Sequence, residues 1–181
     1  RVKVNGKVVV NLATKVSNSD EVHIGKKTIR EDKNKISTVI VYNKPKGEIV
    51  SKKDPQGRRT IYDSLDHKYK HFLSVGRLDY ASEGLLLLSD SVEIVDALMH
   101  SDLERVYKIK VNGVITKPVE QAMQNGLEIE DATGGAFKTS KIKSMSFAPF
   151  LAYDILTNSE KFSKIKVVIS EGKNRELRRF F

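Results

Sequence analysis

The chain has 181 residues, of which 39 % are hydrophobic, enough for one substantial core or for one core with a small appendage. No apolar run approaches the length needed to cross a membrane, and the absence of cysteine excludes disulfides, thiol catalysis and cysteine-based metal sites. A formal charge of +9 and a pI near 9.6 favour a polyanionic partner, although a merely soluble basic surface explains the charge equally well.

The first thirty residues predict a small basic β element. Val2 and Val4 alternate with polar residues, Asn5-Gly6 is typical of a tight hairpin turn, and residues 8–10 form the return strand. Seven basic and two acidic residues give this segment a net charge of +5, which fits either a solvated face or an RNA-binding face. The polar run at 31–35 has no periodicity and predicts a linker, and we expect the boundary at 34–37, between domains at 1–33 and 38–181.

From residue 38 on, short strands outnumber helices. Strands are expected at 38–42, 72–75, 85–88, 106–111, 127–129, 137–148, 153–156 and 165–169, of which 38–42 and 85–88 are expected to be buried. Helices are expected at 60–64, 91–99 and 118–125 and at the end of the chain, with Thr60 and Ser91 as caps, Met99 in the core, and Pro118 opening the third helix. Consecutive strands are often joined by tight turns, so the pattern predicts an α+β domain on a mostly antiparallel sheet.

A charged turn separates the apolar segments that end near Val75 and begin at Leu85. It carries Arg77 and Asp79, and an aspartate between buried strands must reach water, pair with a cation or take part in chemistry. Taken alone, a structural aspartate in a salt-bridged turn explains this motif best.

Other known chemical motifs are absent from the sequence. His67 and His71 are four residues apart, which could place both on one helix face, but no third metal ligand accompanies them. There is also no phosphate-binding glycine loop of the Walker type and no Gly-x-Ser-x-Gly elbow. The sequence therefore predicts neither a metal site nor a cofactor.

Four segments, in this order along the chain, resemble motifs of the RsuA/RluB family of ribosomal RNA pseudouridine synthases, closest to its RluB branch. They are Asn43–Gly47, Gly76–Leu88, Arg105–Tyr107 and Glu171–Arg179. The resemblance covers residues 38–181, and residues 1–33 resemble the second half of an S4 RNA-binding domain. Because the chain opens at Arg1 without methionine and stops inside an expected helix, we expect a fragment that lacks the first S4 helices and the segment after the last motif.

The resemblance implies an α+β pseudouridine synthase fold: a mostly antiparallel mixed β-sheet flanked by helices, preceded by a partial S4-like (αL) domain. It implies a cytoplasmic, monomeric and cofactor-independent enzyme that isomerises one uridine of a structured stem-loop in ribosomal RNA, with large-subunit (23S) RNA as the expected substrate. The alternative is a non-catalytic rRNA-binding or ribosome-assembly factor on the same fold.

The motif match also implies roles for individual residues. Asp79 is the expected nucleophile, Arg178 its ion-pair partner, and Tyr107 the ring that stacks on a flipped-out base. The glutamate at position 176, where glutamine is commoner, adds a carboxylate that would compete with Asp79 for Arg178. Further substrate contacts are expected at Arg77, Leu177, Lys44 and Arg105, and RNA contacts at Lys3, Lys7, Lys26, Lys27, Arg58, Arg59, Lys173 and Arg175.

Overall fold

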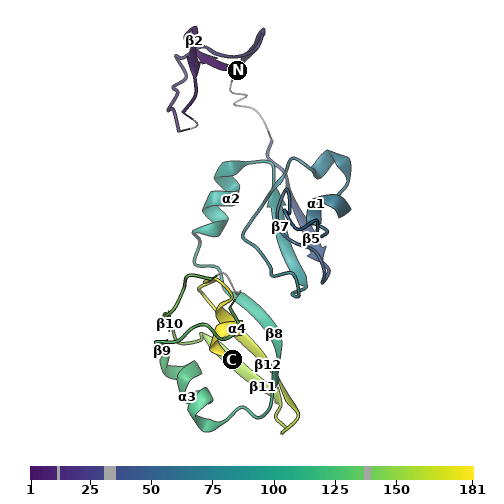
Figure 1. Cartoon of the computed structure of the whole chain (residues 1–181), viewed down its shortest axis with the longest axis vertical. Helices are drawn as coiled ribbons and strands as arrows, with labels where there is room; N and C mark the ends of the chain where they lie inside the picture. The colour runs from purple at the N-terminus through teal and green to yellow at the C-terminus, as the bar shows by residue number, and fades with distance from the viewer. Residues whose placement is uncertain (12, 31–35, 137–139) are drawn as a thin grey trace. The chain divides into compact units, whose positions relative to one another are not determined.

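The structure is a computed structural model that describes residues 1–11, 13–30, 36–136 and 140–181 (Figure 1). The chain divides into two compact units, Arg1–Thr38 and Val39–Phe181. The polar run at 31–35, where we expect a linker, lies outside the described residues. Within the described ranges, no helix is long and apolar enough to span a membrane.

The first unit is a four-stranded antiparallel sheet in the order β2-β1-β3-β4. Its strands are β1 (Val2–Val4), β2 (Lys7–Val9), β3 (Val22–Ile24) and β4 (Lys27–Ile29). The predicted hairpin turn is confirmed, because Asn5 and Gly6 both adopt the positive φ values, 48° and 78°, that a tight two-residue turn of this kind requires. The second hairpin, β3–β4, was not predicted, because its turn at Gly25 and Lys26 lacks the Asn-Gly pair that indicated the first.

The second unit begins with a three-stranded antiparallel sheet in the order β5-β7-β6. The strands are β5 (Val39–Lys44), β6 (Leu73–Ser74) and β7 (Gly84–Ser89). One face packs on the short helix α1 (Ile61–Ser64), and Leu86, Leu88 and Ile61 lie in that core.

The prediction that β5 and β7 are fully buried is wrong. Val41 and Leu85 lie on the opposite face of the sheet and are 69 % and 67 % exposed. Residues of both strands therefore alternate between a covered face and an open one.

Two capping predictions for the helices of this part are confirmed. The backbone N–H of Thr60 donates to Asp63 Oδ2 at 2.8 Å at the start of α1, and a 3-10 turn, η1 (His67–Tyr69), follows. The Ser91 Oγ accepts from the Ile94 N–H at 3.3 Å and begins α2 (Val92–Met99), which contacts β7 (Figure 1). Met99, expected in the core, is 50 % exposed, because it sits on the last turn of α2.

A second antiparallel sheet, in the order β11-β12-β8, contains the longest strands. Its strands are β8 (Arg105–Asn112), β11 (Ala152–Thr157) and β12 (Phe162–Ile169), and the longest are β8 and β12. Alternate residues of β12, including Ile165 and Val167, are fully buried against Met123 of α3 (Lys117–Asn125) and Phe180 of α4 (Glu176–Phe180). The strict alternation of β8 and β12 gives the sheet one core face and one outer face.

A short hairpin-like pair, β9 (Leu127–Ile129) and β10 (Met145–Phe147), completes the second unit. Here the predicted strand at 137–148 is too long: residues 137–139 lie outside the described ranges, and residues 140–144 form no strand. Every strand pair in the described part is antiparallel, so the α+β prediction is confirmed, with the strands divided among several small sheets.

Candidate active site

Asp79 lies in the turn between β6 and β7, which is held by backbone contacts. The N–H of Ser82 donates to the Asp79 carbonyl at 3.0 Å, and the N–H of Gly47 donates to the Tyr80 carbonyl at 2.8 Å. Gly76 takes a φ of 71° at the start of the turn. Two of the motifs identified in the sequence, at 43–47 and 76–88, are therefore joined in space.

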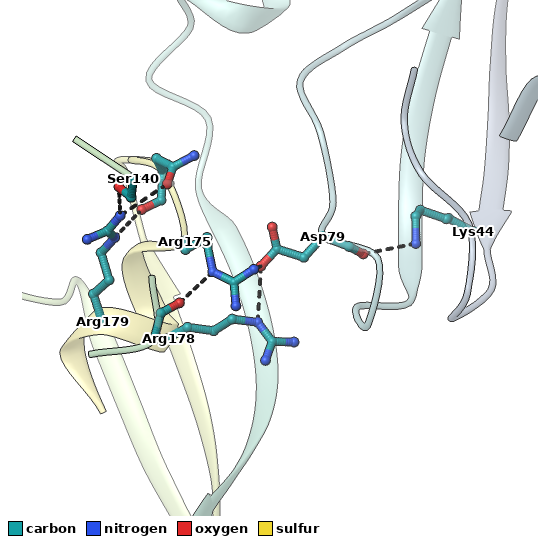
Figure 2. Close-up of polar contacts among 8 residues, drawn as sticks. Lys44, Asp79, Ser140, Arg175, Arg178 and Arg179 are labelled. Carbon is teal, nitrogen blue, oxygen red and sulfur yellow. Dashed lines mark hydrogen bonds and ion pairs between the residues drawn. The ribbon is translucent and has the colours of Figure 1, made fainter. Parts of the chain in front are cut away.

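Lys44 ties the end of β5 to the same turn (Figure 2). Its Nζ donates to the carbonyls of Pro45 and Asp79, each at 3.0 Å, and of Ser82 at 2.7 Å. The residue is fully buried, and burial lowers the pKa of its ammonium group. Because all three ammonium donors have backbone acceptors, the structure gives Lys44 a supporting position where the sequence suggested a substrate contact.

The carboxylate of Asp79 faces two arginines of the last motif, as Figure 2 shows. Arg178 Nε donates to Asp79 Oδ2 at 3.0 Å, and Arg175 Nη1 lies 3.7 Å from the same oxygen. The Asp79 side chain is 31 % exposed, so the pair is open to a ligand on one side. Arg175, expected on the RNA surface, is thus a second cation at this carboxylate.

A loop at residues 131–136, the supporting loop, positions the two arginines. Arg175 has a left-handed backbone with φ 53°, and its Nε donates to the Gly135 carbonyl at 2.5 Å. Gly135 has a φ of +65°, and a Cβ there would overlap the backbone carbonyl of Arg178. Arg179 is buried and donates to Ala132 O of the same loop and, at 2.8 Å, to Ser140 Oγ (Figure 2).

Tyr107 and Leu177 lie at the edge of the second core. Both are half-buried and pack against the cluster that contains Ile165 and Val167. Burial raises the pKa of the Tyr107 hydroxyl, Arg105 lowers it, and the charges of Glu176 and Asp79 raise it again. The phenol is therefore within electrostatic reach of the Asp79 carboxylate.

Glu176 does not compete for Arg178, contrary to what the sequence suggested. Its carboxylate accepts from the backbone N–H of Lys173 at 2.8 Å, and the residue is 6 % exposed. Burial raises the pKa of this carboxyl above its usual range. The side chain therefore closes the turn at residues 173–176 that leads into α4.

Other residues expected to bind substrate or RNA have partners within the protein. Arg105 Nη1 donates to the Ser170 and Leu103 carbonyls, which fixes the chain just before the last motif. Arg58 makes a bidentate pair with Asp54, at 2.9 and 2.8 Å, which lowers the pKa of that carboxyl to about 2. Arg59 Nε lies 3.3 Å from Glu48 Oε1, and Lys173 Nζ lies 2.6 Å from Glu171 Oε2.

Five further residues of the expected sets are exposed, as are Arg59 and Lys173. Arg77 lies on the surface two residues before Asp79. The others belong to the first unit: Lys3, Lys7, Lys26 and Lys27.

The sequence did not identify the roles of Arg175, Arg179 and the supporting loop. The two arginines belong to a basic run whose members look alike in the sequence, and only the fold separates those that face Asp79 from those that anchor α4. Gly134-Gly135 signalled a turn but not its contact with Arg178.

Chemically, the site presents a carboxylate that is both paired and accessible. Arg175 and Arg178 both contact Oδ2, so Oδ1 points away from these two contacts (Figure 2). The two guanidinium groups place positive charge beside this carboxylate. Such a group, with an aromatic ring within electrostatic reach, suits nucleophilic attack on a substrate bound against that ring.

Comparisons with known proteins identify the family of the chain. Residues 38–181 match the family described as RNA pseudouridylate synthase. The whole chain is 57 % identical to a protein of Helicobacter pylori named uncharacterized RNA pseudouridine synthase, and it is 33 % identical to the ribosomal large subunit pseudouridine synthase B of Bacillus subtilis; it covers 69 % of each.

Solved structures show the same fold. A crystal structure of a pseudouridylate synthase aligns with a TM-score of 0.63 at 23 % identity and covers 99 % of this chain and 70 % of the other. At that identity the structural likeness shows a shared fold only. The family match over residues 38–181 and the similar relatives show to which family the chain belongs. We conclude that the chain belongs to the RNA pseudouridine synthases, a family of isomerases, and to its RsuA/RluB-like branch.

Proposed function

We propose that this protein converts a uridine of large-subunit ribosomal RNA to pseudouridine, with Asp79 as the nucleophile. The observation that carries this proposal is the Asp79 carboxylate. It contacts Arg175 and Arg178 of the last sequence motif and remains accessible. Relatives named ribosomal large subunit pseudouridine synthase B support the choice of RNA.

The two arginines leave one carboxylate oxygen for the reaction. Because both contact Oδ2, we assign the attack on the ribose C1′ to Oδ1. The C1′–N1 bond breaks with its electrons moving to the uracil, and an ester bond forms between Oδ1 and C1′. After the uracil rotates, its C5 bonds to C1′ as the ester breaks, the C5 proton is released and N1 takes up a proton. The same carboxylate can instead begin the reaction by removing the proton at C2′: the C1′–N1 bond then breaks, uracil leaves with its electrons, and a C1′–C2′ double bond forms, which gives a glycal. The turned uracil then bonds through C5 to C1′ as C2′ regains its proton, the C5 proton is released, and N1 takes up a proton.

The detached uracil must be held while it turns. We assign this task to Tyr107 and Leu177, which both flank the second core and present half-buried surfaces. A base that has left the helix loses its stacking partners, and an aromatic ring replaces them. We assign to Arg77, which is exposed two residues before Asp79, the holding of phosphate or the filling of the gap in the RNA.

RNA binding is supported by the charge of the chain and by exposed lysines of the first unit. The +9 formal charge favours phosphate contacts through release of counterions. Lys3, Lys7, Lys26 and Lys27 are exposed and available for such contacts. Membership of a family of isomerases favours the enzyme over a binding factor without catalysis.

The test is tritium release from large-subunit ribosomal RNA labelled at uridine C5, because only the isomerisation liberates that hydrogen. The variant Asp79→Asn should lose release while keeping its melting transition and its RNA affinity. Asp102→Asn, which removes the same charge at an exposed position, is the control and should behave as wild type. Tritium release by Asp79→Asn at the wild-type rate would refute the assignment of Asp79 as the nucleophile. Wild-type protein that binds the RNA but releases no tritium would favour the binding factor.

A further inference from the structure

The outer face of the β11-β12-β8 sheet carries a cluster of lysines that the proposed reaction does not use. The inner face holds Tyr107, Ile165 and Val167, which belong to the second core. The outward positions alternate with these along both long strands. Four exposed lysines occupy them: Lys108, Lys110, Lys164 and Lys166, here named the lysine face.

The register of the sheet sets these lysines against one another. Lys164 lies directly opposite Lys110, and Lys166 lies directly opposite Lys108. Side chains in such positions start about 5 Å apart, and like charges there destabilise a sheet. Among the residues paired across the sheet with these lysines, the one acidic residue is Asp154 of β11, which lies opposite Lys166. Among the described residues, none of the four lysines forms an ion pair, so the face keeps a local excess of positive charge.

Two of the four lysines, Lys110 and Lys164, lie over an aromatic ring. Lys110 Nζ lies 4.1 Å and Lys164 Nζ 5.9 Å from the centre of the Phe162 ring, which orients two ammonium groups over one aromatic side chain. Beside Lys166 the surface has a hollow of about 110 Å³, lined also by Ala152, Asp154 and Val168. A rigid sheet thus holds four cations in one place at a cost in stability.

We propose that the lysine face binds the phosphate backbone of RNA as a second contact surface, distinct from the Asp79 site. Charge complementarity identifies the partner, because a dense row of lysines gains affinity from phosphates by releasing their counterions. Such contacts carry no base specificity, so they fix how the RNA lies on the protein while the Asp79 site selects the uridine. Only the identity of the RNA rests on the function proposed above, since any duplex RNA offers the same phosphates.

The experiment compares two threefold variants of the full-length protein. The test variant changes Lys108, Lys110 and Lys164 to glutamine and leaves Lys166 with its neighbour Asp154. The control variant changes Lys68, Lys70 and Lys117, which are equally exposed and lie elsewhere, so both lose the same total charge. The probes are a 20-base-pair RNA duplex without uridine and large-subunit ribosomal RNA transcribed in vitro, titrated over a range of salt concentrations.

For the test variant, the plot of log K against log salt should become less steep: its negative slope should shrink in magnitude by about 2 to 3, because each lost phosphate contact contributes about 0.7 to 0.9. Affinity for both probes at about 0.15 M salt should fall at least tenfold relative to the control. On ribosomal RNA, KM should rise in parallel while kcat at saturation stays unchanged. Its melting temperature should rise, since the variant relieves the repulsion of opposed lysines.

Equal salt slopes and affinities for the test and control variants would overturn the proposal, and so would a fall in melting temperature without a change in RNA binding. Retention of the test variant's RNA affinity alongside lost binding to anionic lipid vesicles would assign the face to a membrane instead. Failure of the proposed function is a separate result: wild-type protein would bind the duplex through the lysine face and release no tritium.

Discussion

Gly135→Ala should damage the Asp79 site from a distance. The φ of Gly135 is +65°, a region that costs an L-residue about 1–2 kcal/mol. The new Cβ would also overlap the backbone carbonyl of Arg178, so the supporting loop and α4 must separate. Separation breaks the 2.5 Å bond from Arg175 Nε to the Gly135 carbonyl, a contact to a charged group that contributes about 1.5–3 kcal/mol. The expected loss is about 3–5 kcal/mol.

Variants at two other glycines separate the cost of the positive φ from the cost of the overlap with Arg178. Gly113→Ala has the same kind of backbone, with a φ of +81°, but no atom within 4 Å of the added Cβ, so it should cost only about 1–2 kcal/mol. Gly134→Ala is next to the site with open space around it and should change stability by less than about 0.5 kcal/mol.

Urea unfolding and tritium release measure the two consequences for each variant. A typical domain is stable by about 5–15 kcal/mol, so Gly135→Ala should still be folded in the absence of urea, although its urea midpoint is lower. Its kcat should nevertheless fall at least tenfold, because Arg175 and Arg178 no longer hold Asp79 in place. If Gly135→Ala matched Gly113→Ala in stability, or kept wild-type kcat, the supporting loop would not position the arginines.

Three further outcomes test individual side chains. Tyr107→Ala should lose stacking worth about 1–3 kcal/mol and slow turnover while RNA affinity is kept in a filter-binding assay; unchanged turnover would make Tyr107 a core residue only. Lys44→Met should remove the Lys44 donor from the carbonyls of Pro45 and Ser82 at about 1–3 kcal/mol each, while the Asp79 carbonyl keeps the Ser82 N–H; the urea midpoint and kcat should fall together, and wild-type kcat would exclude a role at the Asp79 turn. Glu176→Gln should match wild type in stability below pH 4.5 and exceed it at pH 8, because burial raises the folded pKa of Glu176 and its ionisation costs stability as pH rises through that value; equal unfolding midpoints at pH 8 would contradict this.

Local signals predicted the parts of the fold that depend on a few neighbouring residues. The Asn5-Gly6 hairpin, the Ser91 cap and the helix between Pro118 and Gly126 each follow from the backbone preferences of residues within one turn. Gly126 ends that helix with a φ of 83°, which only glycine adopts without strain. Signals of this kind do not depend on the rest of the chain.

Burial could not be predicted in the same way, because it depends on which elements cover a sheet. The apolar runs at 38–42 and 85–88 predicted two buried strands, yet Val41 and Leu85 face outward, since α1 and its neighbours cover one face. The position of Arg175 was hidden for a similar reason. Its side chain reaches Asp79 only because the supporting loop fixes it, and no residue adjacent in sequence indicates that contact.

The pairing of Asp79 with Arg178 has a consequence for the order of events during synthesis. The two residues are 99 positions apart in the sequence. A ribosome that adds about 5–20 residues per second needs about 5–20 s to pass from the first to the second. Throughout that interval Asp79 has been synthesised while Arg178 has not. A nascent chain therefore cannot assemble the paired carboxylate, which forms only when the last motif has been made and has docked.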